Sequence, residues 1–261
     1  MPENALPLIL LTNDDGFDSP GLLALKKAIS RIAEVSIVAP DHNWSAAGHT
    51  KTMHKPLRVN EAALSDGFSI YTTTGAPSDC VALALMGILE RRPELVISGI
   101  NNGANLGHDL TYSGTVAAAM EAVISGIPAI AVSLDARQGE FDLAARFSAY
   151  LATLVLEKGL PPNVLLNVNV PNLPPEKVRG VQITRLGRRV YRDALVKRTD
   201  PYGRDYYWIG GQPPTGISEE GTDVWALAEG FISITPVHMD MTEYSLLGQL
   251  KEWDFTGFKL T

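Results

Sequence analysis

Several features that would place a sequence in a class at once are missing from this one. The 261 residues include a single cysteine, Cys80, so an internal disulfide and a zinc site of several cysteines are excluded. No apolar run approaches the roughly 18 residues that a membrane-spanning helix needs. Residues 1–5 include Glu3 and no basic residue, unlike the start of a secretory signal. We therefore expect a cytoplasmic protein with no membrane contact.

Positive charge is also scarce. Lysine and arginine number 22 against 29 aspartates and glutamates, which gives a formal net charge of −7. An acidic chain has no general attraction for nucleic acid or for an anionic membrane. An anionic substrate would need a bound cation or local hydrogen-bond donors, and we expect no stable nucleic-acid binding.

The best-known phosphate and acyl-transfer motifs are absent as well. The first apolar run is not followed by Gly-x-Gly-x-x-Gly. The chain also has neither a phosphate loop ending in Gly-Lys-Ser/Thr nor a Gly-x-Ser-x-Gly nucleophile elbow. Asn13 stands where phosphatases with an Asp-x-Asp-Gly motif carry their nucleophilic aspartate. These absences weigh against dinucleotide-dependent redox enzymes, phosphate-loop enzymes and α/β-hydrolases.

What the sequence does contain is a regular alternation of apolar runs and helical stretches. The runs that predict buried strands are Leu8–Leu11, Val35–Val38, Leu95–Ser98, Ala129–Val132 and Val164–Val170. Helices are expected from Ser19-Pro20 onward, over Ser113–Ser125 and over Phe141–Leu156. Strands that are apolar on both faces and separated by helices are typical of a mainly parallel sheet covered on both sides. The sequence therefore predicts a doubly wound α/β fold, a Rossmann-like arrangement in three layers.

We expect this α/β catalytic domain to occupy residues 1–180 and to be followed by a region of different residue composition. Within residues 181–230, the stretch from Arg185 to Trp208 interleaves arginines with tyrosines and a tryptophan around Asp200-Pro201-Tyr202-Gly203, which has the residues of a type I turn. This pattern predicts a projecting β-hairpin, either a nucleic-acid platform or an oligomerisation arm, and the acidic chain favours the arm. Residues 231–261 should add a last core strand and a C-terminal arm.

The strongest chemical signal is Asn13-Asp14-Asp15-Gly16, directly after the first strand. Open α/β sheets bind ligands in the crevice outside the carboxyl ends of their strands. Two adjacent carboxylates at such a point repel each other unless a cation or a proton lies between them, and a hard divalent metal would resolve that conflict. The plain alternative is a turn, because Asp-Gly is common turn chemistry.

Two further loops at the same predicted edge supply oxygen donors. The loop after the second strand contains Ser45 and His49, and the loop after the third contains Asn101 and Asn105. Oxygen donors from Asp, Asn and Ser favour Mg²⁺ or Mn²⁺ over zinc or copper. The glycines and asparagines of the third loop could also simply serve a turn with positive φ.

Ser113-Gly114-Thr115 begins the alanine-rich helix that follows. Free N–H groups and the positive end of the helix dipole at such a point can bind an anion. Ser113 and Thr115 add hydroxyl donors, and Gly114 lets the backbone come close. The alternative is that Ser113 merely caps the helix.

Taken together, these pieces resemble the survival protein SurE family of metal-dependent nucleotidases over nearly the whole chain. The matching segments are Leu11–Gly16, Ala39–Asp41 with Ser45 and Gly48–His49, Ser98–Asp109, Tyr112–Glu121, and Ile232–Pro236 with Asp240–Thr242. The resemblance implies a divalent-metal phosphomonoesterase that hydrolyses nucleoside 5′- and 3′-monophosphates, with some activity on polyphosphate. It also implies one Mg²⁺ or Mn²⁺ per subunit, and homodimers or homotetramers with exchanged C-terminal arms.

Carried over position by position, the resemblance assigns the site residues. The implied metal ligands are Asp14, Asp15, Ser45 and Asn101, and the implied substrate-binding residues are Asn13, His49, Asn105, Ser113, Gly114 and Thr115. Asp14 and Asp15 would be catalytic, by activating water through the metal or with one carboxylate as a nucleophile that forms an aspartyl-phosphate. A non-enzymatic module that senses nucleotide or metal on the same fold is the rival hypothesis.

Overall fold

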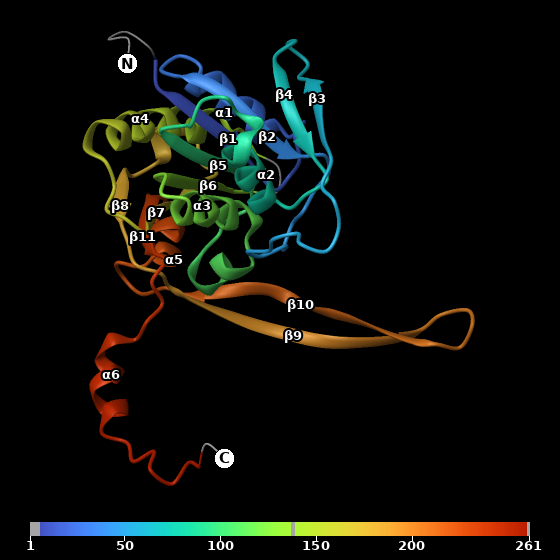
Figure 1. The fold of residues 1–261 in the computed structure, drawn as a ribbon, viewed down its shortest axis with the longest axis vertical. Coiled ribbons are helices and arrows are strands. Elements are labelled where there is room, and N and C mark those ends of the chain that lie inside the picture. Colours follow the sequence, from blue (N-terminus) through green and yellow to red (C-terminus); the bar gives the residue numbers. More distant parts are fainter. Residues whose placement is uncertain (1–5, 137–138, 260–261) are drawn as a thin grey trace.

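One large sheet organises the molecule (Figure 1). Within residues 6–136 and 139–259, which are those that the computed structural model describes, nine strands form this sheet in the order β3-β4-β2-β1-β5-β6-β7-β11-β8. The strands are β1 (Leu8–Thr12), β2 (Glu34–Pro40), β3 (Val59–Ala63), β4 (Ser69–Thr73), β5 (Leu95–Asn102), β6 (Ala129–Asp135), β7 (Val164–Pro171), β8 (Val181–Ile183) and β11 (Ile232–His238). The pairs β3–β4 and β7–β11 are antiparallel, and the pairs between them are parallel. The predicted mainly parallel sheet is therefore confirmed.

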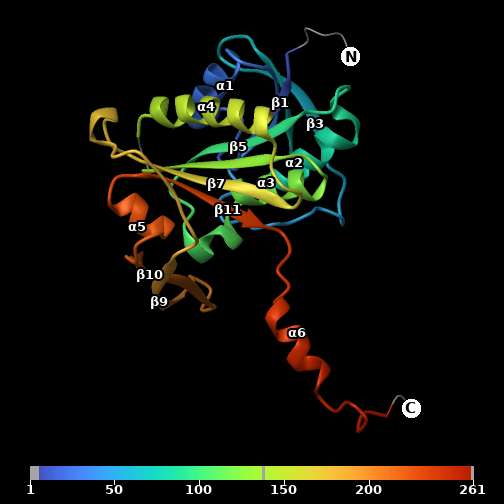
Figure 2. The ribbon, with the colours of Figure 1, turned by 90° about the vertical axis from the view of Figure 1, so that its left-hand side faces the viewer.

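Helices cover both faces of the sheet, which explains why its central strands are apolar throughout. Every residue of β1 is buried. Ile9 and Leu11 belong to the core under α1 (Pro20–Ile29) and α4 (Asp142–Lys158), whereas Leu10 belongs to the core under α2 (Pro77–Leu83) and α3 (Gly114–Ile124). Figure 2 shows these two helix pairs on opposite faces of the sheet. The three-layer α/β prediction is confirmed.

The order of the strands creates a switch point beside β1. From β1 the chain passes through α1 to β2 on one side, and β5, β6 and β7 then extend the sheet on the other side. Loops diverge from the carboxyl ends of the strands at such a point and leave a crevice between them. The residues that follow β1, β2 and β5 therefore meet at one edge of the sheet.

The first helix begins as the sequence predicts. The Ser19 hydroxyl oxygen accepts a hydrogen bond from the Leu22 backbone N–H at 3.3 Å, and Pro20 occupies the first turn. A Cβ atom on Gly21 would lie only 2.0 Å from the Ile100 carbonyl oxygen. Glycine at this position therefore lets the start of α1 pack directly against β5, which brings α1 to the rim of the crevice.

The predicted projecting hairpin is present. β9 (Arg188–Thr199) and β10 (Asp205–Ile217) form a separate two-stranded antiparallel sheet that extends away from the body (Figure 1). Two other elements within 181–230 contact the body instead: β8 pairs with β11, and α5 (Asp223–Ala228) packs on β11 and β7. The projecting part is thus the β9–β10 hairpin itself.

The end of the chain forms an arm. α6 (Tyr244–Lys251) lies apart from the α/β body after the last core strand, β11 (Figures 1 and 2). Its exposed apolar residues include Tyr244, Leu246 and Leu247. Among the described helices, including this one, none has the length and apolar character needed to cross a membrane.

Residues 50–94 received no assignment from the sequence. They contain β3, β4, α2 and a π-helical turn over Ala84–Ile88. The burial of β3 does not alternate cleanly, since only Val59 and Ala62 are partly covered and the other three residues are exposed. Because β3 pairs with one neighbour at the end of the sheet, it lacks the strong apolar pattern that identifies the central strands.

Candidate metal and phosphate site

The loop after β1 is held rigidly at the crevice. The side-chain amide of Asn13 donates hydrogen bonds of 2.7 Å to the Gly16 carbonyl oxygen and of 2.7 Å to the Ser19 hydroxyl. The Trp44 backbone N–H donates to the Asp14 carbonyl oxygen at 2.8 Å. Asn13, predicted to bind substrate, thus shapes the loop that presents the two carboxylates.

Asp14 lies against the first turn of α3. Its carboxylate is almost fully buried, with 3% of the residue exposed, and it accepts a hydrogen bond of 2.5 Å from the Thr115 hydroxyl. A Cβ atom on Gly114 would lie 2.7 Å from the Asp14 Cβ, so glycine allows the helix to begin directly on this side chain. Ser113 caps the helix by accepting from the Val116 N–H at 3.2 Å. The structure therefore brings Asp14 together with Gly114 and Thr115, and Ser113 caps the same helix.

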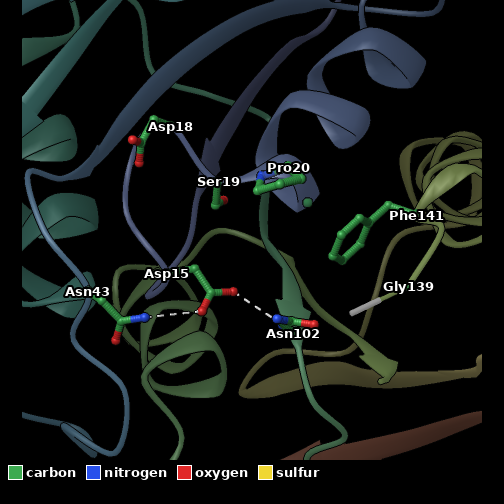
Figure 3. Close-up of a pocket in the computed structure, with 9 residues that line it drawn as sticks. Asp15, Asp18, Ser19, Pro20, Asn43, Asn102, Gly139 and Phe141 are labelled. Atoms are coloured by element: carbon green, nitrogen blue, oxygen red, sulfur yellow. Dashed lines mark hydrogen bonds between the residues drawn. The ribbon is translucent and has the colours of Figure 1, made fainter. Parts of the chain in front are cut away.

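Asp15 faces the ends of two neighbouring strands. Its carboxylate accepts hydrogen bonds from the Asn102 backbone N–H at 3.1 Å and from the Asn43 side-chain amide at 3.4 Å (Figure 3). Asn102 ends β5, and Asn43 lies in the loop after β2. The loops after β1, β2 and β5 are thereby joined through one carboxylate.

The two carboxylates carry an electrostatic cost. Burial raises the pKa of Asp14 to about 6; the Thr115 hydrogen bond opposes this rise and the charge of Asp15 adds to it. Burial likewise raises the pKa of Asp15, against the lowering effect of the Asn102 N–H. None of the ion pairs found among the described residues involves either group. A cation bound between them would relieve both desolvation and repulsion.

The remaining donors fit a hard cation. No group of three or more His, Cys, Asp or Glu side chains in the described ranges is arranged to hold a metal. Two carboxylates would have to be completed by neutral oxygens and water, which is how Mg²⁺ is usually held. Ser45 and Asn101 are the predicted neutral ligands. The Ser45 hydroxyl donates to the Asn43 side chain at 2.6 Å, and the Asn101 amide donates to the Gly103 carbonyl oxygen at 2.8 Å.

Asn105 is held by hydrogen bonds with residues of β6 and β7 to which the sequence gave no role. Its carbonyl oxygen accepts from the side-chain amides of Asn167 at 2.9 Å and Asn169 at 3.0 Å, and its N–H donates to Asn169 at 2.8 Å. Its own side-chain amide donates to the Ser133 hydroxyl at 2.8 Å. The signal was available, because two asparagines alternate with apolar residues in the buried strand β7.

Glu121 is a second residue to which the sequence analysis gave no role. Its side chain, 7% exposed on α3, lies 3.2 Å from the Nε2 of His49 and 2.9 Å from the Nζ of Lys51. The Gly48 N–H also donates to the Tyr112 carbonyl oxygen at 3.0 Å. The loop that carries His49 is thus fastened to α3. The available signal in the sequence was a single glutamate within an alanine-rich, otherwise uncharged helix, because charged residues are rare at buried positions unless they are paired.

Comparisons with known proteins identify the family of this chain. The chain matches the family model described as survival protein SurE over residues 9–193. It is 54% identical over 250 residues to the 5′-nucleotidase SurE of Chloroflexus aggregans, a match that covers 95% of this chain and 99% of the relative. The corresponding protein of Herpetosiphon aurantiacus is 52% identical over 245 residues, covering 93% and 96%.

A solved structure shows the same likeness. The crystal structure of the SurE protein from Aquifex aeolicus superposes with a TM-score of 0.81 at 42% sequence identity, covering 94% of this chain and 98% of that one. Sequence and fold thus agree over nearly the full length, and the chain belongs to the survival protein SurE family.

Proposed function

We propose that this protein is a divalent-metal-dependent phosphomonoesterase that hydrolyses nucleoside 5′-monophosphates to nucleoside and phosphate. The observation that carries the proposal is the buried Asp14 carboxylate, beside Asp15 and directly against the amino end of α3. On this proposal a cation held by the two carboxylates would lie next to an anion bound at the helix start. The name 5′-nucleotidase SurE, carried by relatives about half identical to this chain, supports the choice of substrate.

One Mg²⁺ or Mn²⁺ per subunit would be held by Asp14, Asp15, Ser45 and Asn101, with water completing its shell. When bound, the cation supplies charge neutralisation and Lewis acidity toward the phosphate. Asn43 supports this set, because its side chain accepts from Ser45 and donates to Asp15. Asn43 is therefore proposed as a positioning residue between two ligands.

The phosphate would lie at the start of α3. The backbone N–H of Gly114 and the helix dipole would stabilise negative charge there, while the N–H and the hydroxyl of Thr115 serve Asp14. The hydroxyl of Thr115 orients Asp14, and Ser113 and Asn105 would complete the phosphate pocket. His49, held by Glu121, would contact the substrate from the loop after β2. Activity on 3′-monophosphates and on short polyphosphate belongs to the same proposal.

The direct test measures phosphate release from AMP with Mn²⁺, with Mg²⁺ and with excess EDTA. We expect turnover with the metals, loss in EDTA and recovery when metal is returned. Asp14→Asn should be inactive although folded, while Asp66→Asn, which changes an exposed carboxylate on the β3–β4 turn, should behave as wild type. A non-enzymatic sensor would instead bind metal or nucleotide without releasing phosphate under any of these conditions.

We also propose that the chain works as a homodimer or homotetramer. The β9–β10 hairpin exposes Leu195, Tyr202, Tyr207, Trp208 and Ile209, and the C-terminal arm exposes Trp253, Phe255 and Phe258. Contiguous exposed apolar side chains of this kind mark association surfaces. A second copy of the chain would cover them.

A further inference from the structure

A cavity of about 490 Å³ opens beside Asp15, and no residue of α3 is among its described lining residues (Figure 3). Its walls come from the start of α1, the loop after β2, the end of β5 and the residues before α4. Asp15 lines this cavity and also belongs to the candidate metal site. A ligand whose phosphate lies at the metal could therefore extend into the cavity without leaving the crevice.

One wall of the cavity is apolar and aromatic. The ring of Phe141 faces it, close to Pro20, with Gly139 near the ring edge (Figure 3). A Cβ atom on Gly21 would lie 3.2 Å from the Phe141 Cε1, so the ring packs closely over the first turn of α1. Phe141 is half-buried and also contacts the apolar core, which fixes its orientation. Such a ring offers a rigid face for a flat ligand.

The opposite wall is polar and acidic. It carries the carboxylates of Asp15 and Asp18 and the amides of Asn43 and Asn102. In the part of the chain that the structure describes, no lysine or arginine lines this cavity. A phosphate that reached past the metal would meet the Asp18 carboxylate and no lysine or arginine among the described lining residues, whereas hydroxyl groups could donate hydrogen bonds to carboxylate oxygens.

We propose that this cavity binds the uncharged nucleoside part of the substrate, with the base against Phe141 and the ribose hydroxyls toward Asp18. The inference rests on the proposed phosphatase function. It adds where the nucleoside would lie and predicts a preference for nucleoside monophosphates over diphosphates. The volume lies in the range of small-molecule sites, and an aromatic face with a few convergent polar groups is their usual lining. In a nucleoside diphosphate whose base lies against Phe141, the phosphate not being cleaved would have to enter the acidic cavity, whereas a polyphosphate carries no base and would not have to occupy it.

The first test compares Phe141→Leu with Phe147→Leu. Phe147 lies on α4, is half-buried and packs against the same core, but does not line the cavity. The readout is the ratio of kcat/KM for AMP to kcat/KM for glycerol 2-phosphate, a small ester with no base. Stacking on an aromatic ring predicts a five- to tenfold fall of this ratio in Phe141→Leu, through KM for AMP. Phe147→Leu should keep the wild-type ratio.

An unchanged ratio in folded Phe141→Leu overturns the proposal. The proposed phosphatase function fails separately, if the wild-type protein with metal releases phosphate from neither substrate. Thermal melting of both variants shows that they are folded before the ratios are compared.

The second test addresses the charge of the cavity and needs no change to the aromatic wall. In Asp18→Asn, the preference for AMP over ADP should narrow by about two- to fivefold, because one repulsive charge near the second phosphate is removed. Asp66→Asn again serves as the matched carboxylate control. A preference that is unchanged or widened in Asp18→Asn overturns the assignment of the acidic wall.

Discussion

The carboxyl edge of the sheet and the β9–β10 hairpin distribute polar and apolar groups in opposite ways. At the edge, Asp14 and Glu121 are buried, yet each has hydrogen-bond partners from a distant part of the same chain. In the hairpin, Trp208 is 64% and Ile209 84% exposed. Buried polar groups are costly unless bonded, whereas exposed apolar groups gain by being covered. The polar groups at the edge are thus satisfied within the chain, whereas the hairpin leaves large apolar side chains exposed, which is the basis of the proposed assembly.

The two regions meet at the base of the hairpin. Arg189 of β9 pairs with Asp109 at 2.9 Å, in the 3₁₀ turn Gly107–Tyr112 that leads into α3. The buried Asp223 carboxylate accepts from the N–H groups of Gly107 at 2.8 Å and Gly187 at 2.7 Å. The hairpin base is therefore fastened to the turn that leads into α3, and the proposed assembly would use the outer part of the hairpin.

The largest effect is expected at the edge, from Asp14→Asn. Removal of one carboxylate leaves the proposed cation with a single charged ligand, and we expect kcat/KM for AMP to fall on the order of a thousandfold. Metal affinity measured by titration calorimetry should fall in parallel, with the melting profile retained. Wild-type metal affinity in this variant would contradict the ligand assignment.

The next largest effect is on stability and depends on pH. Because the pKa of Asp14 is raised from 3.8 to about 6, the folded state binds its proton more tightly than the unfolded state does. Folding stability is therefore lost as pH rises between these values. In EDTA, wild type should lose up to about 3 kcal/mol relative to Asp14→Asn between pH 4 and pH 7. Urea titrations of both proteins check this. If the difference in their free energies of unfolding did not vary with pH, the raised pKa of Asp14 would be contradicted.

Thr115→Ala should cost about 1–3 kcal/mol in transition-state stabilisation, seen mainly in kcat/KM. The variant removes the hydroxyl that donates to Asp14 but keeps the helix N–H groups and dipole. Thr115→Ser retains the hydroxyl and should recover most of the loss. Equal activity of all three proteins would reduce Thr115 to packing.

Glu121→Gln should have a smaller effect, about 1 kcal/mol, or a five- to tenfold rise in KM with little change in kcat. The amide keeps the size of the side chain but removes the charge that holds His49 and Lys51. Lys51→Gln separates the two partners, since it leaves the contact to His49. A fall in kcat without a rise in KM would argue against the role of Glu121 in positioning the loop that carries His49.

The smallest effect on activity is expected from the hairpin. Ala194 pairs with Gly210, so residues 195–209 can be replaced by an Asn-Gly turn that keeps the base, including Arg189. Light scattering should show a smaller assembly, while kcat/KM per subunit changes by less than about twofold. An unchanged molar mass of this variant would show that the outer hairpin does not contribute to assembly. A large loss of activity would show that the outer hairpin also supports the site.

Much of the fold and part of the site follow from local sequence. Leu8–Leu11 is apolar at every position, which requires cover on both faces and hence a parallel sheet between helices. Ser19-Pro20 begins a helix because its side chain and ring satisfy the first turn locally. Asp14 and Asp15 stand directly after a buried strand, where a doubly wound sheet has its crevice. Each of these inferences depends on neighbours within a few residues.

Only the tertiary structure decides which of the polar residues form hydrogen bonds with one another. Thr115 donates to Asp14 across 101 positions of the chain, and Asn105 is bonded to Asn169 across 64. These pairs cannot be predicted from the spacing of residues along the chain, because the order of the strands and the placement of the helices bring the partners together. The sequence by itself determined the sheet, its covered faces and the acidic loop at its edge. The tertiary structure also decided the pKa of Asp14, because burial and the Asp15 charge raise it while the Thr115 hydroxyl of α3 opposes the rise.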